Sequence, residues 1–216
     1  DLGSGFKIAM RDMEIRGVGT LLGQRQHGHM QAVGYNLYCK MLNEAVLRLR
    51  GGKNVEDDDF ETVADIQTDA FIPDSYIKNE ALKLDIYRRI AAVENKEEQE
   101  DMLEELIDRF GDPPTAVMNL LEITLLRGLA HSLYITEVKA RPEMITFTMY
   151  EKAKIRVDKI PELLEQMGGN MMFRHAEPAQ FICRLQGGRR RFSGTILEIT
   201  REVLEEMCVL REEEEK

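Results

Sequence analysis

The sequence contains few cysteines, no long apolar run and no nucleotide-binding loop, and each absence excludes a class of protein. Its three cysteines, Cys39, Cys183 and Cys208, are odd in number and far apart, so no disulfide framework is implied. No apolar run approaches the roughly 18 residues of a membrane-spanning helix, and no signal peptide is present. We therefore expect a protein of the reducing cytoplasm with no membrane partner.

The phosphate-binding pattern GxxxxGK[ST] occurs nowhere, so the chain has no visible means of holding a nucleoside triphosphate. The glycines of residues 17–23 follow GxGxxxG rather than GxGxxG and no strand precedes them, which argues against a dinucleotide site. His27 and His29, even with Cys39, lack the partners of a tetrahedral metal site. The sequence predicts no catalytic centre, cofactor or metal in this chain itself, and a solvated or DNA-facing turn at the histidines.

Charge divides the chain into a basic head and an acidic body. Residues 1–50 carry seven Lys/Arg and four Asp/Glu, whereas residues 51–216 carry 22 and 35, for a total net charge of −10. That balance argues against a broad nucleic-acid surface. It suggests that residues 1–50 contact an anion and that residues 51–216 contact a protein, unless the split arose by chance.

Hydrophobic periodicity and glycine positions predict three parts. Residues 1–52 should form two helices around a glycine loop, ending at Gly51-Gly52. Residues 53–62 form an acidic linker, and residues 63–216 a compact α+β domain with a helical group and a small mixed β layer. In that domain we expect an edge strand from Val63 to just before Pro73, helices over about 78–94, 97–110, 114–133, 160–167 and 195–210, and strands over 135–140, 144–149, 171–174 and 180–185.

Residues 14–26, EIRGVGTLLGQRQ, resemble the TRG ("translocation in RecG") element that RecG shares with the transcription-repair coupling factor (Mfd) family. The matching positions run from Gly5 to Gly28. Further segments, FIPDSYI (71–77), YRRI (87–90) and ELIDRFGD (105–112) followed by Pro114, resemble the C-terminal domain of the coupling factors, which RecG lacks. The resemblance covers nearly the whole chain, most weakly from Met144 onward.

This resemblance implies that the parent protein is a translocase on double-stranded DNA, driven by ATP with Mg²⁺. It implies that the parent displaces stalled RNA polymerase and recruits UvrA for nucleotide excision repair. Arg16 and Gln26 are the implied coupling residues, with Gly17, Gly19 and Gly23 as a flexible hook at the DNA. Spacing alone equally allows Arg16 to be a helix C-terminal dipole partner. The family's TRG element begins with an earlier helix carrying its own arginine, and this chain starts after it. Because the ATPase motifs are absent, this fragment is not expected to be an enzyme by itself.

The same resemblance implies that the C-terminal domain packs on the UvrA-binding domain and hides it. Glu105 and Asp108 lie three positions apart and should share one helix face, opposite a buried side of Leu103, Leu106, Ile107 and Phe110. Exposed ion pairs are worth only about 0.2–1 kcal/mol each, which suits a latch that must open. The alternative is that both carboxylates simply solvate the helix.

Two other identities stay open from the sequence: a branched-DNA helicase of the RecG type with an appended domain, and a free-standing acidic adaptor. The run Arg189 to Arg191 is expected to be a solvated loop, with anion contact as the alternative.

Overall fold

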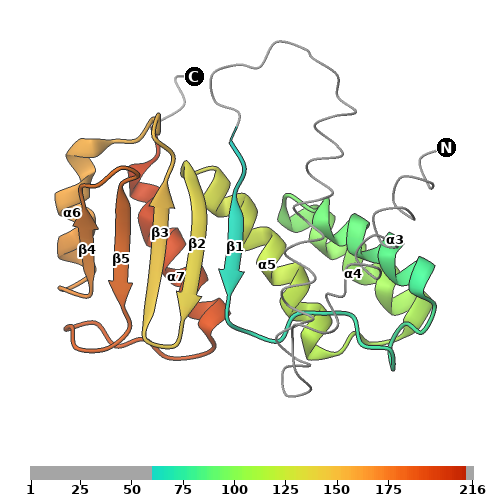
Figure 1. Cartoon of the computed structure of the whole chain (residues 1–216). Helices are drawn as coiled ribbons and strands as arrows, with labels where there is room; N and C mark the ends of the chain where they lie inside the picture. Colours follow the sequence, from blue (N-terminus) through green and yellow to red (C-terminus); the bar gives the residue numbers. More distant parts are fainter. Residues whose placement is uncertain (1–59, 213–216) are drawn as a thin grey trace, which may run out of the picture.

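A computed structural model describes residues 60–212, which combine one mixed β-sheet with five α-helices (Figure 1). In chain order the elements are β1 (Val63–Ile66), α3 (Glu80–Ala91), α4 (Lys96–Phe110), α5 (Thr115–His131), β2 (Ile135–Arg141), β3 (Met144–Met149), the 3-10 turn η1 (Val157–Lys159), α6 (Ile160–Gln166), β4 (Met171–Arg174), β5 (Gln180–Arg184), α7 (Ile196–Met207) and the 3-10 turn η2 (Cys208–Leu210). The expected α+β class is confirmed.

The sheet has the strand order β1-β2-β3-β5-β4. β1 runs parallel to β2, and the other neighbouring pairs are antiparallel. A parallel pair cannot be joined by a tight turn, so the chain leaves β1 and makes three helices, α3 to α5, before it returns as β2. The fold therefore places a helical group beside the β1 edge (Figure 1).

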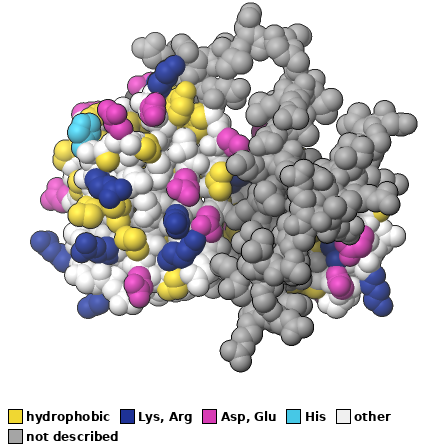
Figure 2. Space-filling model, in the orientation of Figure 1, with side chains coloured by type: hydrophobic (Ala, Val, Ile, Leu, Met, Phe, Trp, Pro, Cys, Tyr) yellow, Lys and Arg dark blue, Asp and Glu magenta, His cyan; other side chains and the backbone are white. Residues whose placement is uncertain are grey.

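The strand register gives the sheet one dry face and one open face. Phe147 lies opposite Phe181 on the dry face, where both are fully buried and Phe181 packs on Phe173 with ring centroids 4.8 Å apart. Lys139 lies opposite Thr146 on the other face. Figure 2 shows the open face with basic, acidic and isolated hydrophobic side chains intermixed. Antiparallel sheets commonly have one solvated face, so the alternation explains the single apolar layer.

Helices α5 and α7 cover the dry face, crossing behind the strands in Figure 1. α5 is apolar on most of its sides because it packs on the sheet, on α7 and on the α3–α4 pair. α7 is amphipathic instead, and its first turn is closed by a capping box in which Thr195 and Glu198 satisfy each other's backbone N–H groups. Helices α3 and α4 begin at Asn79 and Asn95, whose side chains cap them.

The expected helices and strands occur within a few residues of their predicted bounds, with one clear exception. β1 ends at Ile66 rather than just before Pro73, and its last partner in β2 is Ala140. The chain then turns toward the helices, where the backbone N–H of Phe71 donates to the carbonyl of Ala116 at 3.2 Å. Ala70 and Ile72 are thus buried outside any strand, and Phe71 is half-buried.

The first described residues pack on the domain. The ring of Phe60 stacks on His131 at 4.4 Å and on Tyr150 at 4.7 Å between centroids. The hydroxyl of Thr62 donates to the carbonyl of Ile135 at 2.7 Å and lies 3.0 Å from Nδ1 of His131. Since that hydroxyl hydrogen is already used, Nδ1 of His131 must be the donor.

Candidate functional site

The most strongly charged described element is α4, whose carboxylates are concentrated on the side away from the core. Its buried side chains are Met102 and Leu106, with Leu103 and Phe110 partly buried beside them. The carboxylates of α4 are Glu97, Glu98, Glu100, Asp101, Glu104, Glu105 and Asp108. The helix therefore presents a rigid acidic surface, with Lys96 at its start and Arg109 in its last turn as its cations.

Glu105 is held by two arginines. Arg89 from α3 forms a two-pronged ion pair with its two carboxylate oxygens, and Arg109, one turn further along α4, donates to Oε1 at 2.6 Å. The hydrogen bonds from Arg89, with a smaller part from Arg109, hold the pKa of Glu105 below its usual value. The same pair raises the pKa of Arg89. Glu105 is thus ionised and bonded within its own chain.

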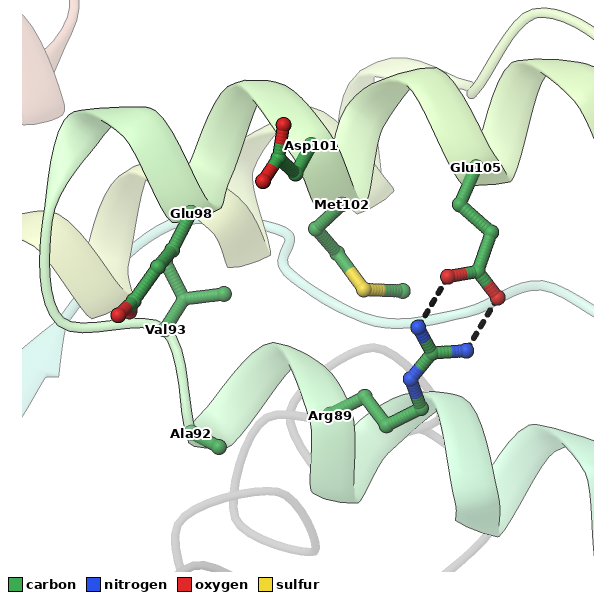
Figure 3. A pocket seen from close by; sticks show the side chains of 7 residues that line it. All are labelled: Arg89, Ala92, Val93, Glu98, Asp101, Met102 and Glu105. Carbon is green, nitrogen blue, oxygen red and sulfur yellow. Dashed lines mark hydrogen bonds and ion pairs between the residues drawn. The ribbon is translucent and has the colours of Figure 1, made fainter.

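A shallow groove lies between α3 and α4, and Figure 3 shows the Arg89–Glu105 pair at one end of it. Its volume is about 310 Å³. The lining residues are Arg89, Ala92, Val93, Glu98, Asp101, Met102 and Glu105. Met102 and Val93 supply the apolar part, while Glu98 and Asp101 carry negative charge. Such a surface suits the aliphatic stem and cationic head of a lysine or arginine from a partner.

Asp108 and Ile107 face solvent, whereas Glu105 is held in ion pairs. Asp108 is exposed, as the predicted acidic face requires. The expectation that Ile107 lies on the buried side is wrong: its exposed fraction is 42%, because Met102 and Leu106 already fill the contact with the neighbouring helices. Two positions from Glu105, Ile107 lies on a different side of α4 from the groove.

The segment at residues 71–77 holds the helical group together. The backbone N–H of Ile72 donates to the hydroxyl of Tyr87 at 2.8 Å. The hydroxyl of Tyr76 reaches the end of α4, bonding the carbonyl of Gly111 at 2.9 Å and that of Leu106 at 3.2 Å. Burial, and then the negative charge of Asp112, raise the pKa of Tyr76. Of the segments that carry the family resemblance, this one is therefore structural.

Gly111 and Lys83 support the same arrangement. Gly111 ends α4 with φ of 82°, a conformation that glycine adopts without strain. Lys83 is buried and paired with Asp74 and Glu80. Burial alone would lower the pKa of Lys83, but its two hydrogen-bonded carboxylates outweigh that effect and raise it. These contacts thus hold in place the helical group that carries the acidic surface of α4.

The predicted translocation residues, Arg16, Gly17, Gly19, Gly23 and Gln26, lie outside the described residues, as do His27, His29 and Cys39. Their roles stay predictions.

The run of arginines is partly structural rather than a freely solvated loop. Arg190 bonds Glu202 at 2.7 Å and Glu206 at 2.8 Å, fastening the loop to α7, while Arg189 and Arg191 are exposed. Within residues 60–212, no cluster of three or more His, Cys, Asp or Glu side chains could hold a metal ion. In the same range no helix is long and apolar enough to cross a membrane.

Sequence reasoning identified Glu105 but missed the two arginines that bind it. A signal for Arg109 was present, since it follows Glu105 by four positions and such pairs meet on a helix. Nothing in the sequence could place Arg89, sixteen positions earlier, against Glu105. That contact depends on how α3 packs on α4.

Comparison with known proteins gives three consistent results. A family model described as "TRCF domain" matches residues 66–160. The chain is 42% identical over 178 residues to the transcription-repair-coupling factor of Staphylococcus haemolyticus (strain JCSC1435), and 40% identical over 170 residues to that of Bacillus subtilis (strain 168). These alignments cover 82% and 78% of this chain. The structure is similar to a crystal structure of the C-terminal domain of transcription-repair coupling factor, with a TM-score of 0.53 and 25% identity, over 72% of this chain and 97% of that one.

The fold is thus that of a coupling-factor C-terminal domain, the part by which the sequence resembled Mfd rather than RecG. The chain belongs to the transcription-repair coupling factor family. It spans 14% of the length of the two curated relatives described.

Proposed function

We propose that this chain is the C-terminal part of an ATP-dependent DNA translocase that displaces stalled RNA polymerase and couples transcription to nucleotide excision repair. The observation that carries the proposal is the 42% identity to a transcription-repair-coupling factor over 82% of this chain. The motor, with its ATP and Mg²⁺, would belong to the rest of the longer protein, because the phosphate-binding pattern is missing here. The proposed setting is the bacterial cytoplasm.

Within that protein, residues 1–52 would transmit closure of the motor lobes to movement along double-stranded DNA. Arg16 and Gln26 would make the coupling contacts, and the glycines between them would let the loop bend past the duplex. Support comes from the match to the TRG element and from the positive net charge of residues 1–50. Contact with phosphates by a planar guanidinium is chemically suitable for such a role.

The described domain would mask a UvrA-binding domain elsewhere in the longer protein, with the face of α4 around Glu105 and Asp108 as the contact. Exposed Asp108 and the acidic groove lined by Glu98, Asp101 and Glu105 lie along one side of α4 and form a surface that fits a basic partner. Each exposed ion pair contributes about 0.2–1 kcal/mol, so a few of them hold a contact that a ligand can still release.

The test of masking is capture of UvrA by the full-length protein carrying Asp108→Lys together with Glu105→Lys. We expect capture to increase, since the reversed charges repel the basic surface and expose the UvrA-binding domain. Glu165→Lys, at an exposed position of α6 on the far side of the sheet, is the matched control. Unchanged capture by a double variant with native circular dichroism would rule out masking through this face.

A further inference from the structure

The carboxylate of Glu105 is bonded on both oxygens by arginines of its own chain. Arg89 approaches in the two-pronged geometry in which a guanidinium matches a carboxylate, and Arg109 adds a second bond to Oε1. All three side chains stay partly exposed, with exposed fractions of 42% for Arg89, 40% for Arg109 and 27% for Glu105. The pairs are therefore within reach of a molecule that docks on α4.

Two cations around one anion compensate the charge of Glu105 itself, while the other carboxylates of α4 keep the surrounding surface acidic. A basic partner that approaches Glu105 meets Arg89 and Arg109 first, and both repel it. The partner forms an ion pair with Glu105 only by displacing at least one guanidinium. Asp108, one turn away and exposed, is open to the same partner without such an exchange.

We propose that Arg89 and Arg109 compete with the basic side chains of the masked domain for Glu105, and so keep the latch weak. This inference rests on the proposed masking function. One ion pair is formed as another is broken. The contact of Glu105 with the masked domain therefore adds little net binding free energy. The intramolecular arginines thereby set the free energy that a ligand must supply to open the contact.

The groove between α3 and α4 lowers the free-energy cost of releasing Arg89 from Glu105. Asp101 lines the same hollow one helical turn before Glu105, on the same side of α4. A guanidinium released from Glu105 can therefore turn toward Asp101 and keep a carboxylate neighbour. The hollow of about 310 Å³ also has room for an incoming side chain along Met102.

Arg89→Gln in the full-length protein tests the competition, with UvrA capture as the readout. Removing the competitor frees Glu105 for the masked domain, so the latch should tighten and the apparent affinity for UvrA should fall by up to about fivefold, the range of one exposed ion pair. A purely structural Arg89 predicts the opposite sign, because a loosened α3–α4 pair would unmask the site and raise UvrA capture. Lys96→Gln removes the same charge from the same hairpin, at a position facing Glu100, and is the matched control.

Two further variants separate the possible outcomes. Asp108→Asn should raise UvrA capture if this face masks at all; if it and Arg89→Gln both leave capture unchanged, masking through this face is wrong and the competition with it. If Asp108→Asn raises capture while Arg89→Gln leaves it unchanged or raises it, the competition alone is overturned. Arg89→Lys keeps the charge but loses the two-pronged geometry, so it should give an intermediate decrease, and thermal unfolding followed by circular dichroism verifies that each variant is folded.

Discussion

Gly128 in α5 lies directly against the backbone carbonyl of Glu94, in the connection between α3 and α4. A Cβ atom at position 128 would come within 2.9 Å of that carbonyl oxygen. The preceding residue, Arg127, donates a hydrogen bond of 2.6 Å to the carbonyl of Ala91 at the end of α3. Two neighbouring residues of α5 thus fix the bend that brings Arg89 and Glu105 face to face.

This contact predicts the effect of Gly128→Ala. In an exposed helix interior the change would stabilise by about 1 kcal/mol, because alanine is the better helix former. Here the added methyl group meets backbone that cannot rotate away, so we expect a decrease of about 1–3 kcal/mol in the free energy of unfolding, measured by urea titration. Met118→Ala, at an exposed position of the same helix, should change it by less than about 0.5 kcal/mol.

The ion pair at Glu105 predicts a pH dependence of stability. Arg89 and then Arg109 lower the folded pKa of Glu105, so the stabilisation is present above its unfolded value of about 4.3 and is lost as the pH falls through the folded pKa. The wild-type chain and Glu105→Gln should therefore differ in free energy of unfolding by a constant amount from pH 7 to about pH 5, and the difference should shrink as the pH falls below about 4.3 toward the lowered folded pKa. A difference that persists unchanged at pH 3 would show that Glu105 contributes through packing instead.

The buried thiol of Cys183 should report global unfolding. Burial raises the pKa of Cys183 to about 12, and its side chain is fully enclosed between the sheet and the helices. Thiolate is the reactive form, so in a Cys39→Ser, Cys208→Ser chain we expect alkylation at pH 8 to proceed only at the rate of unfolding. The measurement is mass-spectrometric labelling with and without urea. Rapid labelling of the native chain would contradict the enclosed position.

The proposed coupling role predicts that Arg16→Ala separates two activities of the full-length protein. ATP hydrolysis stimulated by DNA should remain largely intact, while displacement of a stalled RNA polymerase should be lost. Arg25→Ala, which removes the same charge nine positions further along the sequence, should retain both activities. Parallel loss of hydrolysis and displacement in Arg16→Ala would indicate that the arginine only supports folding.

Local sequence signals were sufficient for most of the described elements. Asn95 and Gly111 bound α4 as an amide cap and a glycine terminator should, and the alternation along residues 144–149 places Ile145 and Phe147 on the dry face. The end of β1 was not predictable in this way. Whether the residues after Ile66 extend a strand depends on the partner beside them, and at Phe71 that partner is Ala116 of α5.

The site shows the same division between local and tertiary information. The sequence by itself determined that α4 is an acidic helix with Leu106 toward the core, because helical spacing and charge are properties of a single segment. Only the tertiary structure decided that Glu105 is bonded to Arg89 while Asp108 faces solvent, and that Ile107 is exposed. Ion pairs between helices depend on the packing of distant segments, here the seating of Gly128 against Glu94, and no local pattern encodes that distance.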